Sequence, residues 1–485
     1  MKKVLLALLI GSTFLLNGCE TGLEAEIYDQ LNPTVFPSNE VEAELYAQAV
    51  YKPFSSRWPS GGYQIFGLEE GHIQQFDAPA DLMTQFTEWG GFFQDYSRAN
   101  FGNFISTGRN RSHIEYIRFV TRTTKIIDDL KNLDLFSNEQ TRNHLLGEVH
   151  MARGWMMYYM LHLYGPVPVI LDPEKINTEA EADLTRPARA DYVSAIANDL
   201  RFAADNLPLD APDYGRFNKG LALTALMRLY LNERDFQNAE TVGREIVSMN
   251  KYSLVDDYMS LFTEATERNS ETIWAISNTG SSTGRGNEGN FNAYPYYTLP
   301  ADFTEATPGW ASPNAVFMAT WDFYDSFDPE DERRNQLVAS YGSRDRTNMR
   351  GAVINKYPGN GGYIGNDIPI ARYADVLLML AESINENSGG PTPEAIDLVN
   401  QIRSRADLGD LPASATASKE AFNDAILEER GKEFLFEGLR KFDLVRHGEW
   451  PGKVEAVAGK TPTSTPLLPI PQWAMDDGMA QNDGY

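Results

Sequence analysis

The chain has 485 residues, of which 42% are hydrophobic and 12% aromatic, and it carries a formal net charge of −26. This composition is typical of a folded protein with a sizeable core, whereas the acidity argues against nucleic acid and other polyphosphate partners, which bind to basic surfaces. The single cysteine excludes an internal disulfide and a thiolate metal site.

The first residues have the pattern of an export signal. Met1-Lys2-Lys3 is positively charged and is followed by an apolar run that is too short to span a bilayer. The run ends at Leu16-Asn17-Gly18-Cys19, which resembles the bacterial lipoprotein signal. We therefore predict a signal peptide over residues 1–18 and a lipid anchor on Cys19. The alternative is an ordinary signal peptide with an incidental cysteine.

Helices are predicted where apolar residues recur every three or four positions. Residues 218–232 and 236–249 form the clearest pair, separated by Glu233-Arg234-Asp235. The first helix has two apolar faces, so it must pack on both sides, and the pair resembles a tetratricopeptide unit that needs neighbours of the same kind. Six further helices are expected, at Ile114–Leu130, Gln140–Leu163, Ala190–Asn206, Ala371–Asn385, Pro393–Arg405 and Lys419–Phe436.

Two segments, about 54–108 and 280–350, lack this period and are rich in Gly, Asn, Ser and aromatic residues. Loops of this length in a folded chain usually carry function, so we expect them to face the ligand. A short strand is predicted at Thr272–Ser277, before the second segment. The helical scaffold is expected mainly over 110–275 and 370–450, within one domain that spans 19–485.

Aromatic side chains in these two segments belong to no helical stripe. Flat rings beside amides and carboxylates suit sugars, whose ring faces stack on them while the hydroxyls form hydrogen bonds. Burial is the more ordinary interpretation for any single ring, but the group favours a polar, ring-shaped ligand. The group comprises Trp58, Trp89, Phe291, Tyr294, Tyr296, Tyr297, Trp310 and Trp321.

Short catalytic motifs in the chain lack the context that their chemistry needs. Gly284–Gly289 matches a dinucleotide fingerprint, but no helix follows to receive a pyrophosphate. Gly280–Gly284 matches a serine nucleophile motif without the strand, turn and helix that it requires. The six histidines have no metal-binding spacing, and we expect neither a metal nor a cofactor. Composition alone does not exclude a catalytic pair of carboxylates of the glycosidase type.

Glu433 and Glu437 are spaced one helical turn apart and would repel each other without nearby cations. Arg430 and Arg440 flank them at three-residue spacing. Because the same segment carries apolar residues for a core, we predict a structural ion network here instead of a catalytic pair.

Longer motifs resemble the SusD/RagB family of nutrient-uptake outer-membrane lipoproteins across nearly the whole mature chain. The matching stretches are scaffold stretches, and they run in the order expected for the family. They are Glu148–Arg153 leading to Leu163–Pro168, Ala190–Pro208, Arg372–Glu382, Ile426–Arg446, Leu468–Pro471 and Gln481–Tyr485.

The resemblance implies a mostly α, SusD-like fold of stacked tetratricopeptide-like helix pairs, with an irregular ligand-binding part and minor β structure. It also implies a non-enzymatic, lipid-anchored protein at the surface of the outer membrane. Such a protein captures oligosaccharides and passes them to a SusC-like TonB-dependent transporter.

The matching motifs carry no ligand residue, so the site is predicted from the loops. We expect Trp89, Tyr296 and Trp310 as stacking surfaces, with Asn292, Asn314 and Arg109 as hydrogen-bond partners. Two alternatives remain: a binder of peptides in an analogous uptake system, and a glycoside hydrolase with two converging carboxylates.

Overall fold

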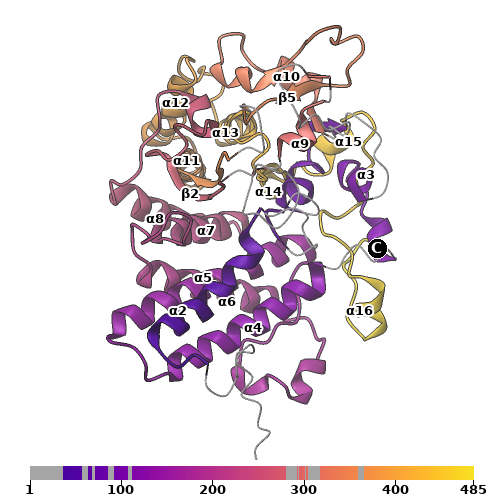
Figure 1. Cartoon of the computed structure of the whole chain (residues 1–485). Coiled ribbons are helices and arrows are strands. Elements are labelled where there is room, and N and C mark those ends of the chain that lie inside the picture. The colour runs from indigo at the N-terminus through magenta and orange to yellow at the C-terminus, as the bar shows by residue number, and fades with distance from the viewer. Residues whose placement is uncertain are drawn as a thin grey trace, which may run out of the picture.

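Helices packed side by side form the scaffold of the computed structural model (Figure 1). It describes residues 36–56, 64–67, 71–85, 92–106, 112–279, 292, 294–300, 302–303, 317–358 and 365–485. The scaffold helices are α2 (Glu40–Gln48), α4 (Ser112–Asn132), α5 (Glu139–Tyr164), α6 (Arg189–Asn206), α7 (Lys219–Asn232), α8 (Phe236–Ser248), α11 (Tyr373–Ser388), α12 (Pro393–Arg405) and α13 (Lys419–Glu433).

Polar caps in the sequence set the ends of these helices. The side chain of Asn218 accepts a hydrogen bond from the backbone N–H of Leu221 at 2.8 Å and starts α7. Ser418 caps α13 in the same way. Gly165 ends α5 with a φ of 75°, which a residue without a side chain adopts freely. The predicted helix pair at 218–249 is confirmed.

Each scaffold helix packs on the next one along the chain from α4 to α8, and α11 continues the stack on α8 before it contacts α12 and α13. The inner helices α5, α7 and α11 are buried on nearly all sides, as a layer between two neighbours must be. This arrangement confirms the mostly α fold of stacked helix pairs.

The two segments predicted to be irregular meet in a small antiparallel sheet. Its strand order is β1–β3–β5–β4, and Met83 pairs with Ala319 across the two segments. A second sheet joins β2, close to the predicted strand at 272–277, to β6. The strands are β1 (Met83–Gln85), β2 (Thr272–Ile276), β3 (Phe317–Ala319), β4 (Leu337–Val338), β5 (Ala352–Ile354) and β6 (Ile368–Arg372).

Short helical elements connect these parts. They are η1 (Ala49–Phe54), η2 (Ile73–Asp77), α3 (Phe92–Ser97), η3 (Gly102–Ile105), η4 (Pro173–Lys175), η5 (Glu179–Ala182), η6 (Tyr258–Phe262), α9 (Pro295–Thr298), α10 (Trp321–Asp325), η7 (Glu332–Gln336), α14 (Arg440–His447), α15 (Gly452–Glu455) and α16 (Gln472–Asp476). Figure 1 shows α10 and β5 at one end of the molecule and α4 at the other.

Two of the differences between predicted and observed helix bounds involve buried charges. Ala371 pairs with Trp274 in the second sheet, so α11 begins only at Tyr373. The predicted helix from Lys419 to Phe436 ends at Glu433, and a tight turn follows in which Phe436 has a φ of 61°. Both changes place a charged side chain, Arg372 and Glu433 respectively, at the end of an element, where it reaches partners far away in the sequence.

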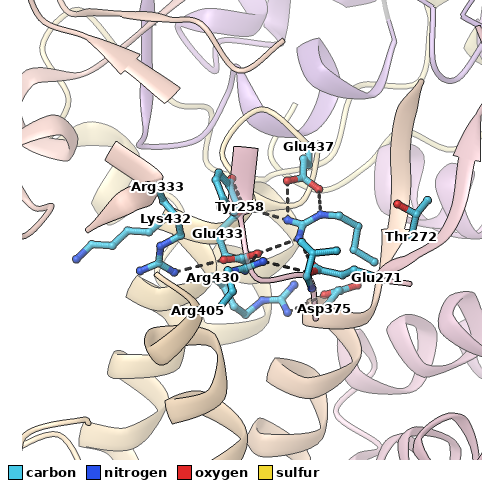
Figure 2. Close-up of polar contacts among 12 residues, drawn as sticks. Tyr258, Glu271, Thr272, Arg333, Asp375, Arg405, Arg430, Lys432, Glu433 and Glu437 are labelled. Carbon is cyan, nitrogen blue, oxygen red and sulfur yellow. Dashed lines mark hydrogen bonds and ion pairs between the residues drawn. The ribbon is translucent and has the colours of Figure 1, made fainter. Parts of the chain in front are cut away.

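Arg372 is the centre of a buried ion network, and its partners Glu271, Glu433 and Glu437 are labelled in Figure 2. Its guanidinium binds Glu271 at 2.6 Å, Glu433 at 2.8 Å and Glu437 at 2.9 and 2.7 Å. Arg405 bridges Glu271 and Glu433 as well. Burial opposes charge on Glu433, but Arg405, Arg372 and Arg333 outweigh it and hold the pKa of Glu433 below its usual value.

A second buried network ties the later helices together. Asp375 of α11 lies between Arg228 of α7 at 2.8 Å and Arg430 of α13 at 2.7 Å. Asp443 of α14 continues the chain of charges to Arg446, which binds Glu382 of α11.

The predicted structural ion network is therefore confirmed, but with other partners. Arg430 binds Asp375 and Asp443, and Arg440 binds Asp81, so neither neutralises Glu433 or Glu437. The helix ends at Glu433, which removes the helical spacing from Glu433 to Glu437 and Arg440. Arg430 stays in the same helix as Glu433, but its guanidinium is taken by the buried carboxylates of Asp375 and Asp443.

Replacing Arg372 with methionine leaves three buried carboxylates with fewer cations. Breaking a buried ion pair from one side costs about 3–5 kcal/mol, so we expect Arg372→Met to lower the free energy of unfolding by at least that amount in urea titrations. Arg244→Met is the matched control, because Arg244 is half-exposed and pairs with Glu240 and Glu394. Arg244→Met should lower the free energy of unfolding by only about 0–1 kcal/mol. Equal losses in the two variants would contradict a central role for the network.

Lys441 of α14 is buried between the rings of Phe76 and Phe101, and its ammonium nitrogen has no hydrogen-bond partner among the described residues. Burial lowers the pKa of Lys441 to about 7. The unfolded chain therefore holds a proton that the folded chain releases between pH 7 and the ordinary lysine pKa of 10.5. The contribution of Lys441 to stability rises with pH across that window.

We expect Lys441→Met to raise the free energy of unfolding at pH 6 by about 1–3 kcal/mol, the cost of burying an unpaired polar group. The difference from the wild-type protein should shrink as the pH approaches 9.5, because the wild-type lysine is then neutral in the folded state. Urea titrations at several pH values measure this difference. Lys251→Met, at an exposed ion pair, is the control and should show no such trend. A difference independent of pH would contradict the lowered pKa.

Candidate functional site

A cleft of about 450 Å³ opens where the first sheet meets the C-terminal helices. Both of the segments predicted to face the ligand contribute to it, Thr84 from the first and Trp321 and Arg350 from the second. Its remaining walls come from α13, α14 and α15 and the residues after them. The lining residues are Asp81, Leu82, Thr84, Thr320, Trp321, Asp322, Phe323, Ser326, Arg350, Glu428, Arg440, Lys453, Ala456, Val457 and Ala458.

Two aromatic side chains, Trp321 and Phe323, are among the described residues that line this cleft, and Trp321 is the larger and more exposed of the two. Its indole N–H donates a hydrogen bond to the backbone carbonyl of Met349 at 3.1 Å, and the ring of Tyr324 packs edge-on against it at 5.8 Å. The guanidinium of Arg346 lies 4.9 Å from the ring centre. These contacts fix the plane of an indole that remains partly exposed, as a stacking surface for a ligand must be.

The charges that line the cleft are balanced. Asp81 and Arg440 form a bidentate ion pair with two 2.8 Å hydrogen bonds, and Lys453 binds Glu428 at 3.0 Å. Asp322 and Arg350 add one further charge of each sign. Burial favours a neutral Asp81, but Arg440 outweighs it and keeps the pKa of that carboxyl low. Such a cleft suits a neutral, polar ligand better than a strongly charged one.

Backbone geometry brings these walls together. The N–H of Thr320 donates to the carbonyl of Leu82 at 2.9 Å and extends the β1–β3 ladder to the edge of the cleft. Gly351 passes so close to β3 that a side-chain carbon there would lie 2.0 Å from the carbonyl oxygen of Ala319. Asp77 accepts hydrogen bonds from the N–H groups of Gly438 and Arg440, which anchors the turn that carries Arg440 into the cleft.

Most of the sequence-predicted site residues lie outside the described residues. These are Trp89, Arg109, Trp310 and Asn314, together with Cys19. The backbone of Tyr296 lies in α9, but its side chain also belongs to the part that is not described. Asn292 is buried, and its side-chain oxygen accepts a hydrogen bond from the N–H of Tyr294 at 3.0 Å. The predicted set of six therefore stays a prediction.

Among the other aromatics singled out in the sequence, two belong to the core. Tyr294 donates from its hydroxyl toward the carbonyl of Phe66 and lies 3.1 Å from a ring nitrogen of His72, and Tyr297 is equally buried. Trp321 differs from both because it lines the cleft. Trp58 and Phe291 fall outside the described residues.

The sequence analysis singled out Trp321, which lines the cleft, but gave no role to the charged residues around it. Asp81, Glu428 and Lys453 come from three distant parts of the chain, and no spacing in the sequence relates them. The only local signal was Asp322 directly after Trp321. Within the described ranges, no three His, Cys, Asp or Glu side chains cluster so as to hold a metal ion.

Comparisons with known proteins all point to one family. A model described as "SusD family" matches residues 335–485, and one described as "Starch-binding associating with outer membrane" matches residues 103–231. The SusD-like protein P38 of Formosa agariphila is 24% identical over 90% of both chains. The starch-binding protein SusD of Bacteroides thetaiotaomicron is 23% identical over 70% of this chain and 72% of its own.

Solved structures agree on the fold. Surface glycan-binding protein A of Bacteroides thetaiotaomicron, solved in complex with laminarihexaose, superposes with a TM-score of 0.75. That likeness covers 92% of this chain and 99% of the other, at 20% sequence identity.

Proposed function

Because this chain belongs to the SusD family, we propose that it captures neutral glycans at the cell surface and delivers them to a SusC-like TonB-dependent transporter. Its role is to bind and hand over the ligand without breaking a bond. One observation carries the choice of ligand: the cleft beside Trp321 combines a fixed, partly exposed indole with charges that balance.

The chemistry of that cleft fits a sugar. A pyranose ring stacks its C–H face on an indole, while carboxylates accept and guanidinium and ammonium groups donate hydrogen bonds to its hydroxyls. The same ligand class is supported by a relative that is named a starch-binding protein and by a structural neighbour that was solved in complex with laminarihexaose. The loop residues Trp89, Tyr296, Trp310, Asn292, Asn314 and Arg109 form the alternative site within the same proposal.

The lipid anchor at Cys19 and the outer membrane are part of the proposal. Among the described residues, no helix has the length and apolarity that crossing a bilayer requires. A tethered binding protein need not bind its ligand tightly, because the tether keeps the captured ligand at high effective concentration beside the transporter. The acidic chain is consistent with a neutral cargo.

Trp321→Ala should weaken glycan binding. Losing one stacking surface of this kind removes about 1–2 kcal/mol of binding free energy. We therefore expect a dissociation constant roughly 5- to 30-fold larger in calorimetry with residues 20–485 and laminarihexaose or maltohexaose. Trp321→Phe keeps an aromatic face and should retain most of the affinity.

The triple variant Trp89→Ala, Tyr296→Ala, Trp310→Ala tests the loop site in parallel. A loss confined to the triple variant would move the site to the loops and overturn the Trp321 cleft. The absence of binding by the wild-type chain to any soluble glycan in a broad array would contradict the proposed function.

Cys19→Ala should release the protein from the membrane fraction and abolish incorporation of labelled fatty acid in a Gram-negative host. Ser12→Ala, within the apolar part of the signal, is the control and should leave both unchanged. If the wild-type protein were itself soluble and unlabelled, the ordinary signal peptide would be the correct interpretation and the anchor would be excluded.

A further inference from the structure

A second hollow, of about 710 Å³, lies in the helical scaffold. Its apolar lining includes Ile117 of α4, Val169 and Leu171 of the segment after α5, and Leu184 and Met479. Trp473 of α16 also lines the cleft, and its exposed fraction of 41% is high for so large an apolar side chain. Clefts of 300–1,000 Å³ with an apolar floor and a few polar groups are typical of small-ligand sites.

Charged side chains at this cleft are available to a ligand. Arg122 is mostly exposed, and its nearest carboxylate is that of Glu115, at 3.9 Å. Lys175 and Asp477 also line the cleft, and their side chains form no hydrogen bond or close ion pair with the described residues. By contrast, the carboxylate of Asp183 accepts a hydrogen bond from the N–H of Thr185 and thereby stabilises the loop that contains both residues. Donors and acceptors are therefore both free at this cleft.

The form of the cleft distinguishes a sugar from a polypeptide. None of the described strands lines it, so it offers no sheet edge to which a peptide strand could add. A ring that presents an apolar face together with hydroxyls, which donate and accept at once, matches a cleft lined by an exposed indole and by Arg122, Lys175 and Asp477. Because charges of both signs line the cleft, a neutral saccharide fits better than an anionic one.

We propose that the cleft at Trp473 is a second oligosaccharide-binding site, separate from the cleft at Trp321 and resting on the proposed glycan-binding function. None of the described residues lines both clefts. Figure 1 shows α10 at the top of the molecule and α16 near the lower right edge. With two sites, one chain holds a long glycan at two points or two short glycans at once, which raises retention at the surface through avidity.

The test uses residues 20–485, which contain every described element, labelled with 5-fluorotryptophan. The eight tryptophans give separate fluorine resonances, and single Trp→Phe variants assign those of Trp321 and Trp473. Laminarihexaose, maltohexaose and cellohexaose are titrated, and calorimetry gives the number of sites. We expect one of the saccharides to shift both resonances, and Trp473→Ala to reduce the number of sites from two to one.

Tyr214→Ala is the matched control, since Tyr214 is similarly exposed, at 43%, and lines neither cleft. It should leave both sites intact. A shift of the Trp321 resonance without any shift of Trp473, with an unchanged number of sites in Trp473→Ala, overturns the second site and leaves the proposed function standing. If no saccharide shifts any resonance or releases heat, the proposed function fails and the second site fails with it.

Discussion

The guanidinium of Arg372 is the interaction on which the arrangement of the molecule depends most. It lies at the end of β6, directly before α11, and binds three buried carboxylates from different parts of the chain, Glu271, Glu433 and Glu437. Buried charges are costly unless each is matched, so these elements must come together in one geometry or leave a charge unpaired. The network therefore selects a single packing of the scaffold against the sheets.

The turn after α13 connects this ion network to the candidate site. Glu433 ends the helix and Glu437 lies in the turn, where the ammonium of Lys356 binds it at 2.6 Å. The next residues are Gly438, with a φ of 76°, and Arg440, both held through their N–H groups by Asp77. Arg440 then pairs with Asp81 in the wall of the cleft. The cleft is thus built on a rigid core and does not depend on loops alone, which favours a preorganised binding surface.

Local signals in the sequence were sufficient for the scaffold. Helical periodicity, the cap at Asn218 and the stop at Gly165 are properties of neighbouring residues, and the corresponding helices lie where they were predicted. Long-range pairing accounts for the errors. Ala371 looks helical from its neighbours but belongs to a strand because Trp274 lies beside it. The partners of Arg430 could not be predicted, since Asp375 lies 55 residues away in the sequence.

The same limit applies to the site. The sequence singled out the two segments that contribute Thr84, Trp321 and Arg350 to the cleft, yet the ion pairs that balance the cleft join residues as far apart as Asp81 and Arg440. Their relation exists only in the fold. The family resemblance did not predict these ion pairs either, because the motifs that carry the resemblance, such as 372–382, form the scaffold.

A crystal structure of residues 20–485 with a bound neutral oligosaccharide tests the central claim most directly. The account predicts an intact saccharide with one pyranose ring on the indole of Trp321, between α10 and α13, and hydroxyls within hydrogen-bonding distance of the charged walls. A cleaved saccharide, or one seated elsewhere on the protein while the Trp321 cleft holds none, would contradict it.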